Sequence, residues 1–291
     1  MSEARDLLVA SALEAAGRVP WSVWRPLATA AGAGLGVRPN AGLRQWQRNV
    51  ATLTGVEPDA RLTAAAFTSW ARNTVTSLQL GQLSPTEIVD RIVMDPEQEH
   101  RLRSTAATRG AVLALPHMGS WDLAGAWACA VGMPVSTVAE ELGRREFALF
   151  VEARERLGFT VYGHRDPTVT EKLVADARSK KLVCLLADRN FSRGGAPVVW
   201  PGPTPIAAKM PLGPAHVACE SGSLLMALAA TFEGDKLRLH LSEPIEPPDD
   251  ASNRLRRYQP MMQRVCDFFA EMIVGYPQDW HMLQPIFADR A

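Results

Sequence analysis

The sequence predicts an α/β fold, with a mostly parallel central sheet flanked by helices and a helical region at the N-terminus. Two observations carry this prediction. From Ala111 onward, short apolar runs typical of buried strands alternate with longer segments of helical periodicity. Before that point, apolar residues recur mainly at helical spacing. We therefore expect a helical region over residues 1–95 that packs on an α/β body over residues 96–291, with no clear linker between them.

Composition indicates a globular protein and argues against several other classes. The 291 residues are 47% hydrophobic and 21% charged, which is ordinary for a globular domain. Lys plus Arg equals Asp plus Glu at 31 each, and this balance argues against a protein that engulfs nucleic acid. The first residues are partly acidic and lack a sustained apolar core, so we expect no secretory signal. No run of about twenty apolar residues occurs, so we expect no transmembrane helix.

The N-terminal region divides into several expected helices. Residues 19–37 are apolar and rich in Ala and Gly, carry Trp21 and Trp24, and are flanked by Arg18 and Arg38. Two interpretations are open: the segment packs on the body as a helical hairpin, or it lies in a membrane interface with Trp near the headgroups. Two further helices are expected at residues 62–80 and 85–94.

The body is predicted to alternate between strands and helices. The expected strands are the apolar runs at residues 111–116, 135–139, 159–162, 182–187 and 224–230. Leu237, Leu239 and Leu241 alternate with polar neighbours, which predicts an edge strand. The expected helices begin near Trp121 and continue at residues 144–157, 168–179, 212–220 and 253–274. Residues 193–209 are rich in Gly and Pro, and we expect a loop there that lies over the site.

A candidate site lies where the strand over residues 111–116 ends. His117 and Gly119 follow at once, and Asp122 falls in the first turn of the next helix. In α/β sheets, functional sites gather at the carboxyl ends of strands. Asp122 could fix the imidazole tautomer so that His117 acts as a base, or it could simply complement the helix dipole. Backbone amides near Gly119 or in the next helix would then hold a developing negative charge.

A second carboxylate occupies an equivalent position. Asp188 and Arg189 follow the strand over residues 182–187, just as His117 follows its own strand. Neighbouring strands would place this carboxylate beside the imidazole, so Asp188 and Asp122 are rival partners for the histidine. The alternative for Asp188 is an ion pair with a nearby arginine, either Arg189 or Arg193.

Several sequence blocks resemble a known family. HMGSWD, at residues 117–122, matches the H-x-x-x-x-D motif of the glycerophosphate and lysophospholipid acyltransferase superfamily. The blocks ALPHMGSWDLAG, TVAEEL, FVEARERLGF, LLADRN, MPLGPA and YPQDWHMLQP resemble the actinobacterial phosphatidylinositol mannoside acyltransferases. Those enzymes share a branch with the lauroyl and myristoyl acyltransferases of lipid A synthesis. The resemblance runs from about residue 111 to residue 285, with a weaker helical match upstream.

The resemblance implies an activity and a mechanism. A long acyl chain would move from acyl-coenzyme A to a hydroxyl of a glycolipid, most directly a mannose of phosphatidylinositol mannoside. His117 would be the general base. Relatives pair this histidine with an acidic residue, usually glutamate, at the place of Asp188, so we favour Asp188 as the charge-relay partner. Asp122 would then orient the turn, while Ser120 keeps a covalent route open.

The resemblance also implies substrate contacts. Glu140, which follows the strand over residues 135–139, matches a glutamate near the acceptor sugar, and carboxylates accept hydrogen bonds from vicinal hydroxyls. Arg154 matches an arginine at the polar acceptor, and the alternative is a solvated helix face. Arg189 is expected among the substrate-binding residues. His281, in the WH pair, either lines the acceptor groove or is a packed structural histidine.

The implied partners are acyl-coenzyme A as a co-substrate, a glycolipid acceptor and a membrane surface. We expect no metal, because the histidines lack metal-ligand spacing. We also expect no cofactor, with acyl-coenzyme A acting only as a co-substrate. Arg193 and Lys209 are either contacts for the phosphates of coenzyme A or ordinary surface cations. A lipid acceptor favours the membrane interpretation of residues 19–37, with a peripheral monomer on the cytoplasmic face of the plasma membrane. Alternatives are another glycolipid or lysophospholipid acceptor, an acyl-coenzyme A thioesterase, and a non-catalytic lipid-binding protein.

Overall fold

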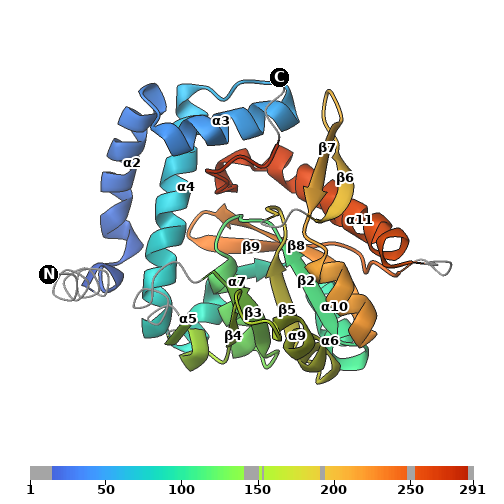
Figure 1. Cartoon of the computed structure of the whole chain (residues 1–291). Helices are drawn as coiled ribbons and strands as arrows, with labels where there is room; N and C mark the ends of the chain where they lie inside the picture. Colours follow the sequence, from blue (N-terminus) through green and yellow to red (C-terminus); the bar gives the residue numbers. More distant parts are fainter. Residues whose placement is uncertain (1–14, 141–150, 153, 191–193, 248–252, 288–291) are drawn as a thin grey trace, which may run out of the picture.

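The computed structural model describes residues 15–140, 151–152, 154–190, 194–247 and 253–287, and these form a seven-stranded central sheet with flanking helices (Figure 1). The strand order is β1-β9-β8-β2-β5-β3-β4, and every neighbouring pair is parallel except β8 and β9. The predicted α/β fold is therefore confirmed. The strands are β1 (Ile92–Met94), β2 (Ala111–Leu115), β3 (Val135–Ala139), β4 (Thr160–Gly163), β5 (Leu182–Leu186), β8 (Leu224–Glu233) and β9 (Lys236–Leu241).

The side chains of β2 alternate between two apolar cores. Val112 and Ala114 face the core formed with α9 (Val169–Arg178), α10 (Gly213–Ser221) and α11 (Arg254–Gly275). Leu113 and Leu115 face the core formed with α6 (Pro96–Thr108) and α7 (Trp121–Ala130). Every residue of β2 is buried. The strand is therefore a continuous apolar run because helices cover both faces of the sheet.

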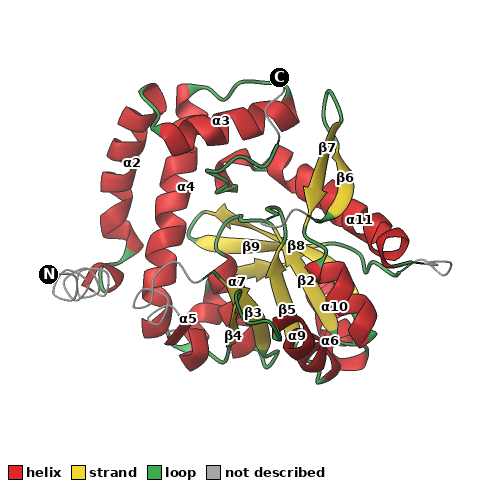
Figure 2. Ribbon diagram, viewed as in Figure 1, coloured by secondary structure: helices red, strands yellow, loops and turns green. Residues whose placement is uncertain are grey.

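The described part of the N-terminal region is mainly helical, as predicted, and includes α2 (Trp21–Val37), α3 (Ala41–Thr54) and α4 (Ala60–Gln79). Figure 2 shows α2 alongside α4. The contact is close because a Cβ at Gly36 would lie only 2.3 Å from the Ala60 carbonyl oxygen. The side chains of Asn40 and Asp59 cap α3 and α4, because each accepts a hydrogen bond from a backbone N–H in the first turn of its helix. Among the described residues, no helix is both long enough and apolar enough to cross a membrane.

Three local predictions are wrong. Residues 196–210 form an antiparallel hairpin, β6 (Ala196–Trp200) and β7 (Ile206–Met210), in place of the expected loop. Alternate residues of β6 are buried, so its period of two was the strand signal, and Pro197 lies on the exposed side. The helix expected over residues 85–94 ends early as α5 (Pro85–Asp90). Strand β1 follows it and pairs with β9, so β9 is not the edge strand we expected.

The helical region and the body are closely connected in space across the predicted boundary at residue 95. β1 lies before that boundary but belongs to the central sheet. α4 packs against α7 and against a short 3-10 turn, Pro277–Asp279, near the C-terminus. Most of the helix expected over residues 144–157 lies outside the described residues, as does Arg193.

The chain after α11 returns to the central sheet. We name residues 279–283 the C-terminal strap. Trp280 in this strap forms an isolated antiparallel bridge with Met118, which follows β2. The strap therefore lies against the loop that carries the sequence motif.

Candidate active site

The loop between β2 and α7, which we name the histidine loop (residues 116–120), presents His117 at the carboxyl edge of the sheet. Gly119 has a φ of +59°, and a Cβ there would lie 2.4 Å from the Ala230 carbonyl oxygen, so this turn requires glycine. α7 begins directly after the loop and carries Asp122 in its first turn, as predicted. The His117 side chain keeps 24% of its exposure, which leaves it accessible to a substrate.

His117 and Asp188 are direct partners. β2 and β5 pair in parallel with Leu115 opposite Leu186, so the residues that follow the two strands lie side by side. Asp188 Oδ1 lies 2.6 Å from His117 Nδ1, and Oδ2 accepts the His117 backbone N–H at 2.9 Å. Trp280 Nε1 donates to the same Oδ2 at 2.9 Å. The fully buried Asp188 carboxylate is therefore held by donors from two directions.

The charge of Asp188 sets the tautomer of His117. Burial alone would raise the pKa of Asp188, but the His117 imidazole and the hydrogen bonds from His117 and Trp280 outweigh it and hold that pKa below its ordinary value. An ionised Asp188 can only accept a hydrogen bond, so the proton of the neutral imidazole lies on Nδ1. Nε2 therefore carries the free lone pair. Trp121 packs edge-on against the imidazole, with ring centroids 5.3 Å apart. His117 is therefore arranged to accept a proton at Nε2.

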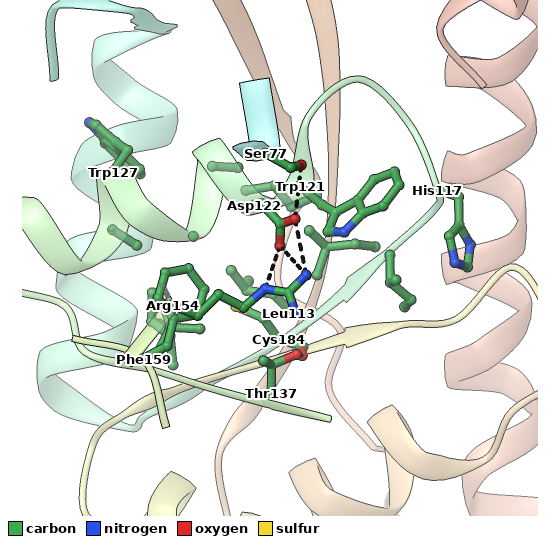
Figure 3. Close-up of a pocket in the computed structure, with 18 of the residues that line it drawn as sticks. Ser77, Leu113, His117, Trp121, Asp122, Trp127, Thr137, Arg154, Phe159 and Cys184 are labelled. Carbon is green, nitrogen blue, oxygen red and sulfur yellow. Dashed lines mark hydrogen bonds and ion pairs between the residues drawn. The ribbon is translucent and has the colours of Figure 1, made fainter. Parts of the chain in front are cut away.

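Asp122 has different partners. Arg154 donates to it twice, from Nε to Oδ1 at 2.9 Å and from Nη2 to Oδ2 at 3.0 Å. Ser77, on α4, donates its hydroxyl to Asp122 Oδ2 at 3.1 Å (Figure 3). The exposed fractions of the Asp122 and Arg154 side chains are 8% and 18%, so solvent screens this ion pair little. Asp122 therefore joins α7 to α4 and to the helical segment that carries Arg154, whereas Asp188 binds His117.

The C-terminal strap holds the histidine loop through its main chain. The Gly119 N–H donates to the Asp279 carbonyl at 2.8 Å, and the His281 N–H donates to the His117 carbonyl at 2.7 Å. His281 Nε2 lies 3.0 Å from the Gly119 carbonyl oxygen, so this nitrogen carries the proton. The amide of Gly119, which the sequence suggested as an oxyanion donor, is thus already used within the protein.

Burial shifts the pKa values of two side chains of the strap in opposite directions. Burial lowers the pKa of His281 to about 4, and the hydrogen bond to Gly119 opposes this only in part, so the imidazole is neutral near pH 7. Burial raises the pKa of Asp279, although Ser69 Oγ at 2.5 Å and the Phe232 N–H at 2.9 Å donate to its carboxylate. These contacts fix the strap to α4 and β8 and give His281 a packed setting.

An apolar cavity of about 590 Å³ begins at His117 and extends between α7 and the sheet. Its walls include Leu113, Leu186, Trp127 and Phe159, among other apolar side chains. Figure 3 shows the Asp122–Arg154 pair within this lining, with His117 at its margin. Glu140, an exposed residue that follows β3, also contributes to the lining. The cavity therefore combines an apolar interior with a few polar groups close to His117.

A second cavity, of about 510 Å³, lies on the side of Asp188 that faces the β6–β7 hairpin. Arg189, Asn190 and Lys209 contribute polar groups to it, together with Gln284 from the C-terminal segment. Arg189 thus lies beside Asp188 but outside the apolar cavity. The two cavities meet the His117–Asp188 pair from different directions.

The structure distributes the predicted residues over three settings. His117 and Asp188 form a pair, Asp122 and Arg154 form a second pair, and His281 supports the loop from the strap. Ser120 is fully buried, and within the described residues its hydroxyl has no hydrogen-bond partner, so its surroundings do not activate it as a nucleophile. In the same part of the chain, no three His, Cys, Asp or Glu side chains converge on a metal position.

Two contributors escaped the sequence analysis. Trp280 donates to Asp188, and Ser77 donates to Asp122. The WH pair drew attention to the segment that contains Trp280, but no local signal links it to a strand end almost a hundred residues earlier. Ser77 lies within a helix in an ordinary polar position, so only the packing of α4 on α7 reveals its role.

A histidine held by a buried carboxylate beside an apolar cavity is an arrangement suited to moving an acyl group. Comparison with known families agrees: a family model described as "Bacterial lipid A biosynthesis acyltransferase" matches residues 1–288. The chain belongs to this family, and it is an acyltransferase.

Individual relatives are more specific. The chain is similar to a phosphatidylinositol mannoside acyltransferase of Mycolicibacterium smegmatis, with 36% identity over 255 residues that cover 84% of this chain and 80% of that protein. A phosphatidylinositol mannoside acyltransferase of Mycobacterium tuberculosis is 34% identical over 258 residues, covering 84% of this chain and 77% of its own length. The resemblance found in the sequence blocks is thereby confirmed.

Proposed function

We propose that the protein transfers a long acyl chain from acyl-coenzyme A to a mannose hydroxyl of a phosphatidylinositol mannoside. The observation that carries the proposal is the His117–Asp188 pair at the margin of an apolar cavity. The names of the relatives support the acceptor class. An apolar cavity beside the base suits an acyl chain, because a thioester carbonyl at its entrance would lie near His117.

The chemistry needs one base and one charge partner. His117 Nε2 accepts the proton of the acceptor hydroxyl while that oxygen attacks the thioester carbonyl. Asp188 stabilises the imidazolium that forms. When the tetrahedral intermediate collapses, the carbon–sulfur bond breaks, and the proton passes from Nε2 to the departing coenzyme A sulfur. First-turn amides of α7, which have no carbonyl partner within the helix, are the donors that would hold the oxyanion.

The polar residues around the pair are suited to the two substrates. Glu140 lies beside the entrance and would accept hydrogen bonds from sugar hydroxyls. Arg154 would act near the acceptor while remaining paired with Asp122. Arg189 and Lys209 would face the phosphates of coenzyme A from the polar cavity.

Residues 21–37 support a peripheral position on a membrane. Five residues on the face of α2 away from α4 are exposed and lack charge: Val23, Leu27, Ala30, Gly34 and Val37. Val23, Leu27 and Val37 keep 56%, 62% and 73% of their exposure, which is typical of an interfacial helix. We expect Leu27→Asp to reduce sedimentation with anionic vesicles, and Leu255→Asp, at an exposed leucine on α11, to leave it unchanged. Equal binding by both variants would contradict the assignment.

The decisive experiment incubates the purified enzyme with palmitoyl-coenzyme A and a panel of glycolipid and lysophospholipid acceptors, followed by mass spectrometry of the products. We expect acylated phosphatidylinositol mannoside as the main product and no product with His117→Ala. Coenzyme A release that is independent of acceptor would instead indicate a thioesterase. Glu140→Ala is expected to raise the KM for the acceptor more than the KM for the donor, and an equal change in both would contradict its acceptor role.

A further inference from the structure

A separate cavity, also of about 590 Å³, lies on the other side of α4 from the apolar cavity. Trp70, Asn73 and Ser77 of α4 line the apolar cavity, whereas Arg72 and Gln79 line this one. Its other walls include the start of α2, the residues that follow α4, the segment that joins α5 to β1, the β8–β9 turn and Leu123 of α7. We name it the basic cavity. It shares no lining residue with the site that contains His117.

The basic cavity concentrates positive charge. It is lined by five basic side chains and two exposed carboxylates: Arg18, Arg25, Arg72, Arg91 and Lys236, with Asp90 and Asp235. Within the described part of the chain, Arg25, Arg72 and Arg91 form no ion pair with any carboxylate. In a concave site the low-dielectric walls focus such a field and attract an anion. The imbalance contrasts with the neutral charge of the whole chain.

Arg72 is fixed in place without having its charge neutralised. Its guanidinium lies 4.1 Å from the centroid of the Phe232 ring and donates to the Gly234 carbonyl at 2.8 Å. Burial lowers the pKa of Arg72, nearby Asp235 and Asp279 oppose this, and Arg25 and Arg91 lower it further. The surrounding protein therefore orients the guanidinium while leaving it in an unfavourable electrostatic environment. A bound anion would offset both the desolvation cost of the buried guanidinium and its repulsion from the neighbouring arginines.

Part of the remaining lining is polar and suits a headgroup that carries the anion. Thr76, Gln79, Gln82 and Ser22 supply hydroxyl and amide groups, and Trp21 supplies an aromatic wall. Guanidinium groups bind phosphate through paired, charge-assisted hydrogen bonds, which a compact ammonium cannot reproduce. We propose that the basic cavity is a binding site for a phosphate group carried by a polar headgroup, with Arg25, Arg72 and Arg91 as its ligands. The phosphate has two possible sources, a soluble phosphorylated polyol or the headgroup of an anionic phospholipid.

The test uses the full chain and two probes. Inositol 1-phosphate, titrated by calorimetry, represents the soluble source. Vesicles of phosphatidylcholine with and without phosphatidylglycerol, assayed by co-sedimentation, represent the lipid source. The variant is Arg25→Ala with Arg91→Ala, because neither side chain makes a hydrogen bond in the described structure and the fold should be retained. The control is Arg165→Ala with Arg264→Ala, which removes the same charge from exposed positions elsewhere.

We expect the wild type to bind at least one probe and the Arg25/Arg91 variant to bind it at least about tenfold more weakly. The control variant should stay within about twofold of the wild type, a limit that separates a specific site from general charge attraction. Inositol 1-phosphate binding that is weakened in the Arg25/Arg91 variant identifies a soluble ligand. Weakening of only the phosphatidylglycerol-dependent part of vesicle binding identifies a lipid headgroup, since the apolar face of α2 is unchanged in this variant. The proposal is overturned if the wild type binds neither probe, or if both double variants lose the same affinity. Acyl transfer is not the readout, so the result is independent of the proposed reaction.

Discussion

The two flanks of the histidine loop each hold a carboxylate, but they hold it for different purposes. On the β5 flank, Asp188 is fully buried and accepts hydrogen bonds from His117 and Trp280. On the α4 flank, Asp122 is paired with Arg154, whose charge is permanent. Asp122 is five residues from His117 in the sequence and Asp188 is 71 residues away. The register of the parallel sheet, and not distance along the chain, selects the partner of the histidine.

The comparison separates a chemical role from a positional one. The charge of Asp122 is already compensated by a guanidinium, so this pair mainly links three helical segments. Asp188 faces a group that becomes positive only when it accepts a proton. In the proposed reaction, its charge would therefore favour the imidazolium state. Variants on the two flanks should differ accordingly.

The largest effect is expected for His117→Ala, which removes the proposed general base. Loss of a general base typically lowers the rate by about 10²–10⁴. We expect acyl transfer to fall at least that far, measured as kcat with saturating acyl-coenzyme A and acceptor. The strap binds the His117 main chain, so thermal unfolding should change little. A variant that keeps near-wild-type kcat while folded would show that another group is the base.

Asp188→Asn is expected to have the second largest effect. The amide is nearly isosteric, but it removes the charge that would stabilise the imidazolium in the proposed reaction, and it no longer fixes Nδ1 as the protonated nitrogen. We expect kcat to fall by about 10²-fold or more, with acyl-coenzyme A binding retained. Asp188→Glu restores the charge and should be more active than Asp188→Asn, although the extra methylene must fit a fully buried site.

Asp122→Asn sharpens the comparison from the other flank. It weakens the bonds from Arg154 and Ser77, and charged hydrogen bonds of this kind contribute about 1.5–3 kcal/mol each. We expect a loss of unfolding free energy in urea of about 1–3 kcal/mol and a smaller loss of kcat than for Asp188→Asn. Ser77→Ala is the milder control. If both Asp188 variants resemble the wild type while Asp122→Asn is inactive, the roles of the two carboxylates are reversed.

The sequence predicted those parts of the site that lie directly at the ends of strands. Apolar runs of five or six residues located β2 and β5, and the parallel-sheet rule then brought His117 and Asp188 to one edge. The same rule could not decide between Asp188 and Asp122, because it says nothing about side-chain direction. The structure decides between them, because Asp188 contacts the imidazole of His117 directly and Asp122 is paired with Arg154.

The features that the sequence did not predict depend on contacts between distant elements. The strap reaches the histidine loop only after α11 has crossed the molecule, so its hydrogen bonds to His117 and Gly119 have no local signature. The β6–β7 hairpin was obscured for another reason. Its Gly and Pro content is typical of a loop, and the alternation of buried Ala196, Val198 and Trp200 carries less weight in a five-residue strand.

The smallest expected effect concerns the strap on the Asp188 flank and appears as a pH dependence of stability. His281 has a folded pKa of about 4 against an ordinary value of 6.5, so the folded state favours the neutral imidazole. This contribution to stability is complete above about pH 6.5 and is lost as the pH falls toward 4. For the wild type we expect the unfolding free energy in urea to fall by roughly 2 kcal/mol over that range from this group.

The matched variant is His281→Gln, whose amide can still donate to the Gly119 carbonyl but cannot gain a proton in this range. Asp188 does not confuse the comparison, because a carboxyl with a lowered pKa loses its contribution only below its ordinary value of 3.8. The control is His100→Gln, at an exposed histidine on α6, which should keep the wild-type pH dependence. We expect the slope between about pH 6.5 and pH 4 to flatten only for His281→Gln. Equal slopes in all three proteins would show that His281 titrates normally in the folded state, and that the strap does not hold it neutral against the histidine loop.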